Sequence, residues 1–326
     1  MEVICRAHTS HRKKPVNLIE QDLPLFKHEL EKQIRETYFL SLKNVFLLKD
    51  SIFKPNELKF FTKYTHVLGL RKKERIKRAL LLKGPKITIE KAIWIVDDWS
   101  FGYFHWLTDA LPRLMAVAKY KHPVVLPKYL ENYSFVKASL DLLGYESIFI
   151  PENSPVKIKE LILPSHTAPS GNFNKELLQK LRTAFLEKIS VPKPEKKIYI
   201  SRKKAPKRHV VNEDELQFLL KKEGYEIHYF EDYTLKQQIE LVSSCKSLIG
   251  LHGAGLTNIL FMQKGAQLLE LRNRNDAHNN CYFSMASDLD IVYYYLLNDG
   301  NNNETHTVDV TVHPDQLKKV LDLMKA

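Results

Sequence analysis

The segment SLIGLHGAGLTN, residues 247–258, decides the fold. Its first half is a short apolar run typical of a buried strand, and we expect a helix to start near Leu256. Gly253 and Gly255 let the backbone approach a ligand closely and adopt a positive φ. The N–H groups and the positive dipole end at the helix N-terminus would then seat a phosphate or diphosphate. A tight turn that needs glycine only for steric reasons is the alternative.

The same His-Gly-Ala-Gly run resembles the oxyanion loop of lipases and esterases, which accompanies a Gly-x-Ser-x-Gly nucleophile elbow. No such pentapeptide occurs in the chain, which disfavours a hydrolase. In the phosphate interpretation, His252 adds a side-chain donor. Glu270, near the end of the next strand, resembles the acids that grip ribose hydroxyls. A solvated carboxylate at a strand edge is the alternative for Glu270.

Strands and helices alternate on both sides of this segment, from about residue 92 onward, with one Pro- and Lys-rich break at residues 191–197. Such alternation indicates βαβ units and parallel sheets. We therefore predict an α/β protein of two lobes. The N-terminal lobe covers residues 1–190 and is strand-rich at its start. The C-terminal lobe covers residues 191–326, and its terminal amphipathic helix could pack back on the N-terminal lobe.

Composition narrows the partners without choosing among them. Lys and Arg outnumber Asp and Glu by 50 to 38, which favours nucleotide diphosphates, acidic glycans, phospholipid surfaces or nucleic acid. No nucleic-acid-binding motif supports the last of these. Three distant cysteines indicate neither a disulfide framework nor a zinc site. With no signal-like start and no run of ~18 apolar residues, we expect a cytoplasmic protein. The basic run at residues 71–78 leaves room for peripheral membrane contact.

A second cluster of chemical groups lies in DDWSFGYFHWLTDALPRL, residues 97–114. His105 and Asp109 are four residues apart and share one helical face, which suits deprotonation of an attacking hydroxyl. Trp106 and neighbouring rings offer flat surface for a sugar, and Arg113 follows one turn later. A structural His–Asp pair with buried aromatics is the alternative. The adjacent acids at residues 97–98 make a poor metal site.

The third cluster is YISRKKAPKRHVVNE, residues 199–213. Its strand ends at Ser201, and cations follow where α/β sheets bind ligands. Arg202 is placed to clamp a phosphate through two hydrogen bonds, and Arg208 lies in the same loop. A basic surface loop is the alternative, and we expect it to describe most of the lysines.

These three segments, in this order, resemble glycosyltransferase family 61 over about residues 94–271. The resemblance implies a GT-B fold, in which two Rossmann-like lobes with parallel sheets face a central cleft. The donor would bind mainly on the C-terminal lobe and the acceptor mainly on the N-terminal lobe. It also implies an inverting enzyme that uses a nucleotide-sugar, a UDP-sugar in the first place, as substrate, without a metal or other cofactor.

The resemblance assigns roles to the residues quoted above. The diphosphate would be held by Arg202 and by the loop of His252, Gly253, Ala254, Gly255, Leu256, Thr257 and Asn258, and the ribose by Glu270. His105, Asp109 and Arg113 would face the reacting centre, but the resemblance does not fix which residue is the base. From the shared helical face of the pair we expect Asp109 to be the catalytic base, with His105 as its orienter or substitute. Trp106, Arg113 and Arg208 would face the acceptor or the cleft.

The start of the sequence, beside this resemblance, leads us to expect a bacterial member at the inner membrane face. Its acceptor would be a glycan or lipid-linked glycan in the assembly of capsule, lipopolysaccharide or another cell-surface polysaccharide. A non-catalytic nucleotide-sugar-binding or scaffold subunit of a polysaccharide-assembly complex is the alternative. Donor binding without turnover would favour that alternative.

Overall fold

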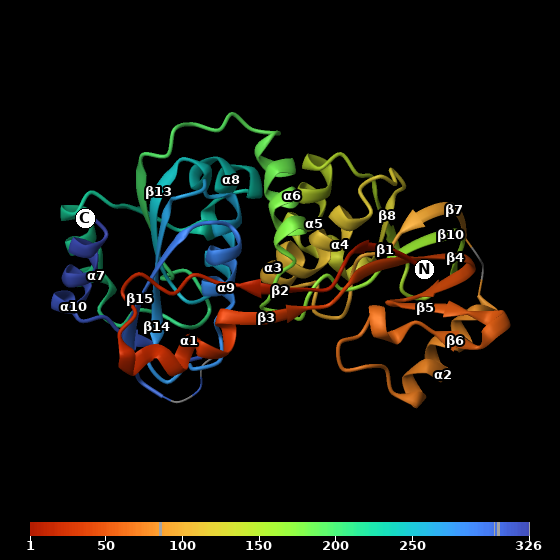
Figure 1. Ribbon diagram of the computed structural model, residues 1–326. Helices are drawn as coiled ribbons and strands as arrows, with labels where there is room; N and C mark the ends of the chain where they lie inside the picture. Colours follow the sequence, from red (N-terminus) through yellow and green to blue (C-terminus); the bar gives the residue numbers. More distant parts are fainter. Residues whose placement is uncertain (85–86, 303, 305–306, 326) are drawn as a thin grey trace. The chain divides into compact units, whose positions relative to one another are not determined.

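The computed structural model describes residues 1–84, 87–302, 304 and 307–325, and it forms two compact α/β units (Figure 1). Unit 1 consists of Met1–His8 and Ile34–Ser170, and unit 2 of Thr9–Gln33 and Gly171–Ala326. The predicted α/β class is therefore confirmed. The boundary falls before residue 191, so the Pro- and Lys-rich break lies inside unit 2.

Unit 1 is built on a mixed sheet in the order β6-β5-β4-β10-β7-β8-β9. Its parallel part is β10 (Val156–Pro164), β7 (Ile87–Ile93), β8 (Val124–Pro127) and β9 (Ser147–Ile150). All four residues of β8 are buried, as expected for a strand covered on both faces. The antiparallel part is β4 (Thr37–Leu48), β5 (Ser51–Lys54), β6 (Lys59–Phe60) and β1 (Glu2–Cys5).

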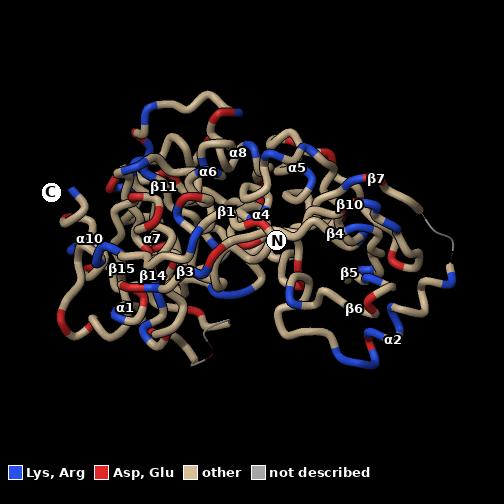
Figure 2. Tube along the Cα trace, turned by 45° about the vertical axis from the view of Figure 1, so that its right-hand side comes forward, with Lys and Arg blue, Asp and Glu red and all other residues tan. Residues whose placement is uncertain are grey.

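The helices of unit 1 are α2 (Lys72–Leu80), α3 (Tyr103–His105), α4 (Leu111–Ala116) and α5 (Ser134–Leu142). A π-helical segment, Trp106–Ala110, joins α3 to α4. Pro112 explains the wide turn, because it has no N–H to donate to the carbonyl of Thr108 four residues earlier. The basic run lies on α2, whose residues are all at least partly exposed (Figure 2).

Unit 2 contains a sheet in the order β12-β11-β13-β14-β15-β16. Five strands are parallel and only the last pair is antiparallel; the bounds are β11 (Lys196–Ile200), β12 (Glu226–His228), β13 (Cys245–Leu251), β14 (Gln267–Asn273), β15 (Val292–Gly300) and β16 (Val310–Thr311). Figure 1 shows α7 (Glu213–Lys222) and α10 (Pro314–Leu323) on one face of this sheet and α8 (Leu235–Ser243) and α9 (Cys281–Asp288) on the other. Helix α6 (Lys175–Leu186) also belongs to this unit.

The terminal helix completes unit 2. Leu317 and Leu321 of α10 are buried in one core cluster with Tyr199 of β11 and Leu271 of β14. From the sequence, this helix could pack on the N-terminal lobe. Its apolar face is instead used by the sheet nearest to it in the chain. None of the described helices combines the length and hydropathy needed to cross a membrane.

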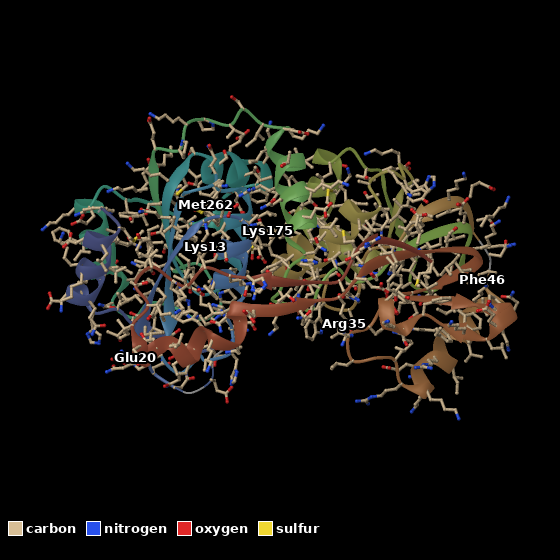
Figure 3. All side chains as sticks on the ribbon, viewed as in Figure 1. Lys13, Glu20, Arg35, Phe46, Lys175 and Met262 are labelled. Atoms are coloured by element: carbon tan, nitrogen blue, oxygen red, sulfur yellow. The ribbon has the colours of Figure 1, made fainter. Side chains whose placement is uncertain are left out.

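The segment Thr9–Gln33 also belongs to unit 2, although it lies near the start of the chain. It contains part of β2 (His8–His11), all of α1 (Leu23–Leu30) and most of β3 (Glu31–Ile34). Phe26 of α1 is fully buried, with its ring 5.1 Å from Phe283 and 4.9 Å from Tyr295. In Figure 3, Lys13 of this segment lies near Lys175 of α6, and the ammonium groups approach Asp290 at 4.0 and 3.7 Å. The predicted N-terminal lobe of residues 1–190 therefore differs from unit 1 at residues 9–33 and 171–190, which belong to unit 2.

Short 3-10 turns complete the described structure: Glu20–Asp22, Pro55–Glu57, Thr62–Tyr64, Leu81–Lys83, Lys128–Asn132, Phe230–Asp232 and Ala254–Phe261.

Candidate functional site

In unit 2, the candidate phosphate-binding residues meet at the carboxyl edge of the sheet. Strands β11 and β13 are parallel neighbours, so Arg202 and Gly253, which follow them, lie at the same edge. A Cβ atom added to Gly253 would be 2.3 Å from Nη1 of Arg202. The guanidinium group therefore lies directly against the backbone of the glycine turn.

The loop after β11 holds Arg202 in place through its own backbone. Nε of Arg202 donates to the carbonyl of Arg208 and Nη2 to that of Lys207, both at 2.7 Å. Burial lowers the pKa of Arg202, and the charge of Arg208 adds to this effect. An anion bound beside the two guanidinium groups would relieve their repulsion. Arg208 itself has a φ of 61°, a conformation that is uncommon for a residue other than glycine.

Gly253 and Gly255 allow neighbouring groups to approach the backbone closely, and neither residue adopts a left-handed conformation. Gly253 has a φ of 162°, which is extended backbone, and Gly255 is also outside the left-handed region. Our prediction of positive φ at these positions was wrong. A Cβ on Gly255 would lie 3.3 Å from the side chain of Ile200, so the turn packs closely on β11.

The helix that follows is a 3-10 segment that begins at Ala254, and not an α-helix that starts near Leu256. The side chains of Leu256, Thr257 and Asn258 are buried. Asn258 donates from Nδ2 to the carbonyl of Gly255 at 3.0 Å, which fixes the turn. A ligand here would meet backbone N–H groups at Ala254 and Gly255 and not the three buried side chains.

Glu270 is fully buried and does not face solvent at a strand edge. Its two oxygens are 2.5 Å from Nδ1 of His252 and from the hydroxyl of Tyr293. In this conformation Glu270 orients the His252 ring and leaves Nε2 for a ligand, which differs from the predicted contact with ribose. Burial and the neighbouring Glu270 charge raise the pKa of Tyr293, so its hydroxyl stays a donor.

Sequence reasoning missed Glu213, the residue that anchors the start of this loop. Glu213 is buried, and its Oε1 accepts hydrogen bonds from Tyr199, Ser201 and the N–H of Arg202 at 2.8, 2.7 and 3.4 Å. The sequence gives no sign that Glu213, among neighbouring acids at the start of α7, turns inward.

In unit 1, the π-helical segment brings together the second pair of predicted residues. Nδ1 of His105 lies 2.8 Å from Oδ2 of Asp109. Ser170 donates to the same carboxylate oxygen at 3.0 Å. The hydroxyl of Thr108 donates to the carbonyl of Phe104 at 2.8 Å and lies 3.3 Å from the other carboxylate oxygen. The carboxylate of Asp109 is thus held by Ser170 beside an imidazole, an arrangement that suits a positioned base.

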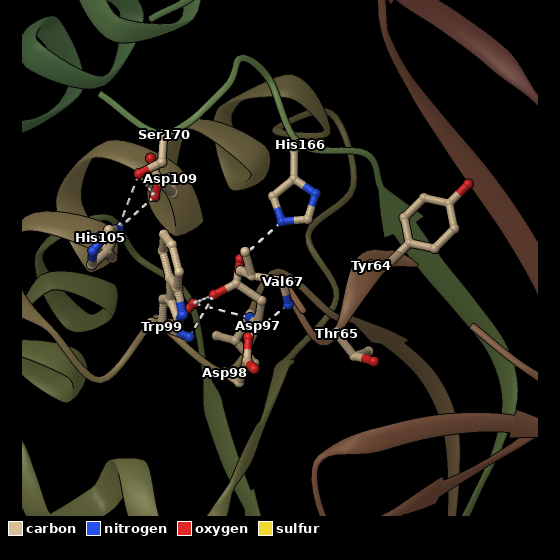
Figure 4. Close-up of polar contacts among 12 residues, drawn as sticks. Tyr64, Thr65, Val67, Asp97, Asp98, Trp99, His105, Asp109, His166 and Ser170 are labelled. Carbon is tan, nitrogen blue, oxygen red and sulfur yellow. Dashed lines mark hydrogen bonds and ion pairs between the residues drawn. The ribbon is translucent and has the colours of Figure 1, made fainter. Parts of the chain in front are cut away.

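Asp109 lines a cavity of about 690 Å³ within unit 1 (Figure 4). The wall also includes Tyr64, Asp97, Trp99, His166 and Ser170. This volume is typical of small-molecule sites. The ring of Trp99 lies 5.1 Å from that of His105, so it connects the cavity to the His105–Asp109 pair.

Trp106 and Arg113, which were predicted to face the acceptor or the cleft, are buried and do not line the cavity. Trp106 is fully buried and donates from Nε1 to Ser139 at 2.8 Å, so it cannot stack on a sugar. Arg113 is also buried, and its guanidinium donates to the carbonyls of Pro164 and Tyr64 at 2.8 and 3.2 Å. Burial lowers the pKa of Arg113 to about 10, against the opposite effect of two neighbouring carboxylates. Arg113 therefore supports the cavity from behind.

The sequence also missed a second imidazole–carboxylate pair in this cavity. Nε2 of His166 lies 2.8 Å from Oδ2 of Asp97. Burial alone would raise the pKa of Asp97, but His166 and the charge of Arg113 hold it well below its usual range. In the described parts of the chain, no three His, Cys, Asp or Glu side chains gather as ligands for a metal ion.

Each of the two α/β units therefore carries one candidate site. The family model described as Glycosyltransferase 61 matches residues 103–269, about half of the chain. The match begins at α3, includes His105, Asp109, Arg202 and the turn at Gly253, and ends in β14 next to Glu270. The chain belongs to glycosyltransferase family 61, as the resemblance predicted.

Two curated relatives carry transferase names. The EGF domain-specific O-linked N-acetylglucosamine transferase of Drosophila melanogaster is 34% identical over 124 residues, which are 36% of this chain and 23% of that protein. The human Protein O-linked-mannose beta-1,4-N-acetylglucosaminyltransferase 2 is 26% identical over 200 residues, 59% of this chain and 32% of its own length. The matches thus span a third or less of these relatives.

Proposed function

We propose that the protein is an inverting glycosyltransferase that moves a sugar from a nucleotide-sugar, with UDP as the first candidate nucleotide, to a hydroxyl of a glycan or lipid-linked glycan. Family membership supports sugar transfer, and the names of both relatives describe transfer of N-acetylglucosamine. The observation that carries the proposal is the contact of Arg202 with the Gly253 turn. We also propose a GT-B arrangement, with the donor on unit 2 and the acceptor on unit 1.

The donor diphosphate is held by cations and backbone N–H groups. Arg202 and Arg208 supply the charge, the turn at Ala254 supplies N–H groups, and His252 supplies Nε2. Preorganised donors of this kind stabilise the charge that develops on the leaving diphosphate. They take the place of a divalent metal ion in this proposal.

Asp109 is the base that accepts the proton of the attacking hydroxyl. The oxygen of that hydroxyl forms a bond to the anomeric carbon. The bond from this carbon to the diphosphate oxygen breaks, and the nucleoside diphosphate leaves with the electron pair. Attack opposite the leaving group inverts the anomeric centre. His105 orients the carboxylate through the contact at 2.8 Å.

The acceptor belongs to the precursors of a cell-surface polysaccharide, such as capsule or lipopolysaccharide, in a bacterial cytoplasm. A net charge of +12 and the exposed basic helix α2 suit work beside anionic lipid. A screen of polysaccharide precursors as acceptors tests this assignment.

A thermal-shift panel of UDP, GDP, CMP and dTDP with their sugar conjugates, with and without Mg²⁺, tests the donor site. A ligand at a hundred times its Kd stabilises the folded state by about 2.7 kcal/mol. We expect one nucleotide series to raise the Tm of the wild type and of Lys203→Ala, whose lysine is exposed and pairs with Asp214. Arg202→Ala should lose the shift. An equal shift in Arg202→Ala would contradict the donor site.

Turnover of the shifting donor then tests the base. Asp109→Asn should bind donor normally and lose turnover by about a hundredfold or more, which is the usual size of general-base catalysis. Near-normal turnover in Asp109→Asn would exclude it as the base. Donor binding with no turnover by the wild type on any acceptor would favour the scaffold subunit instead.

A further inference from the structure

Two imidazole–carboxylate pairs, His105–Asp109 and Asp97–His166, contribute side chains to the wall of the unit 1 cavity. Figure 4 shows both pairs. In the first pair, the carboxylate of Asp109 lines the cavity and His105 supports it. In the second pair, the imidazole of His166 is 33% exposed and lines the cavity, while the side chain of Asp97 is only 4% exposed. The two pairs therefore present different chemical groups to a ligand.

In a single displacement the acceptor hydroxyl loses one proton, and Asp109 accepts that proton in the proposed function. His166 is then available for another task. Its position is fixed, because Asp97 holds Nε2 with Oδ2 while Oδ1 of Asp97 accepts hydrogen bonds from the N–H of Trp99 and from Ser100, both at 3.0 Å. A ring held in this way presents Nδ1 in one direction.

The chemistry of Nδ1 fits a hydroxyl group. In a neutral ring that donates from Nε2 to Asp97, Nδ1 accepts a hydrogen bond, and in a charged ring it donates one. A hydroxyl can donate or accept, so it is matched to His166 in both states. An ammonium or carboxylate ligand would match only one of them.

Trp99 connects the two pairs and provides the flat surface between them. The backbone N–H of Trp99 donates to Asp97. The ring of Trp99 lies 5.1 Å from that of His105, and Trp99 lines the same cavity. A sugar in this cavity would lie in a space whose wall includes Asp109, Trp99 and His166. Figure 4 shows Trp99 between the His105–Asp109 pair and the Asp97–His166 pair.

We propose that His166, positioned by Asp97, binds a non-reacting hydroxyl of the acceptor sugar and thereby selects the acceptor. This inference rests on the proposed function, in which Asp109 takes the proton of the reacting hydroxyl. It assigns the cavity of unit 1 to a monosaccharide unit that carries at least two free hydroxyls.

The first test measures binding without turnover. Saturation-transfer NMR with the methyl glycosides of glucose, galactose, mannose, N-acetylglucosamine and xylose identifies which sugars the wild type binds. His166→Ala should weaken the strongest of them about three- to tenfold, the value of one lost hydrogen bond. Asp97→Asn keeps His166 but loosens it, and we expect a smaller loss. His122→Ala, in the same unit and outside the cavity wall, is the matched control and should bind as the wild type does.

The second test uses monodeoxy forms of the glycoside that binds. The wild type should lose about three- to tenfold in affinity when the selected hydroxyl is removed, and His166→Ala should show no further loss with the same analogue. Equal binding by wild type and His166→Ala, or no glycoside binding by the wild type, would overturn the inference. His166-dependent binding without donor turnover would instead count against the proposed function alone.

Discussion

Arg202 and Gly253 follow neighbouring strands of unit 2. The side chain of Arg202 restricts which residue can stand at position 253. Nη1 of Arg202 occupies the space in which any larger residue at 253 would place its Cβ. The sequence identified both residues as binding candidates. It could not show that they touch, because strand order is set by packing across the sheet and is not written in either segment. Trp106 illustrates the same limit, since residues 99–106 include five aromatic side chains and only packing decides which of them turns inward.

Gly253→Ala should therefore weaken donor binding more than it weakens the fold. The new methyl group displaces the Arg202 guanidinium, and the loss of a hydrogen bond to a charged ligand costs about 1.5–3 kcal/mol, or about tenfold or more in Kd. Isothermal titration with the nucleotide from the thermal-shift panel measures it. Gly255→Ala is the comparison, since its Cβ meets Ile200 at 3.3 Å and needs only a small adjustment. A Kd unchanged in Gly253→Ala would contradict the role of this contact.

The Asp97–His166 pair predicts a pH dependence of stability. The folded-state pKa of Asp97 is held below its usual range, whereas the unfolded chain takes up its proton near pH 3.9. The contribution to stability is therefore complete above the unfolded pKa and is lost as the pH falls through the folded pKa. Asp97→Asn should lower the free energy of unfolding by about 1–3 kcal/mol at pH 7, and the difference from wild type should shrink below pH 4. Urea unfolding at pH 7 and pH 3 measures it; a constant difference would count against the pair.

At the scale of elements, the π-helical segment Trp106–Ala110 carries Asp109 and directly follows His105. The four-residue spacing predicted that the two side chains meet, and their contact confirms it. The spacing predicted a regular helix, however, and not the wide turn that precedes Pro112. The 3-10 segment after Gly253 was likewise expected to be an α-helix. In both places the apolar pattern indicated a helix, while local packing and one missing N–H decided its type.

Pro112→Ala should favour an ordinary α-helix here, because alanine has the backbone N–H that proline lacks. We expect the free energy of unfolding to stay equal or rise. Turnover should fall by about tenfold or more, since a displacement of about 1 Å at a reacting group costs up to about a hundredfold. Pro314→Ala at the start of α10 is the control, because proline at this position removes no helix bond. Unchanged turnover in Pro112→Ala would show that the π turn is not needed.

At the scale of the whole molecule, the chain leaves and re-enters each unit. It passes from unit 1 to unit 2 after His8, returns at Ile34 and crosses again after Ser170. Alternating strands and helices predicted the α/β class from the sequence. They did not assign residues 9–33, because the rings that enclose Phe26 belong to residues near the other end of the chain.

Phe26→Ala should destabilise unit 2 by about 3–5 kcal/mol, the usual cost of removing a buried phenylalanine ring. All three tryptophans, Trp94, Trp99 and Trp106, lie in unit 1, so their fluorescence reports on that unit. Hydrogen exchange of β14 and β15 reports on unit 2. We expect faster exchange in unit 2 of Phe26→Ala, and no such change in Phe218→Ala, whose ring is exposed. Unchanged exchange in Phe26→Ala would show that α1 does not stabilise this unit.

The path of the chain also sets an order of events during synthesis. Unit 1 is complete once Ser170 has left the ribosome, and domains generally fold as units while the rest of the chain is being made. The segment with Phe26 emerges before most of unit 1, yet its partners Phe283 and Tyr295 are made more than 250 residues later. The nascent protein thus carries the unpacked α1 helix beside an already folded unit until Phe283 and Tyr295 have been made. This is the stage at which a chaperone that binds short hydrophobic segments would have its target.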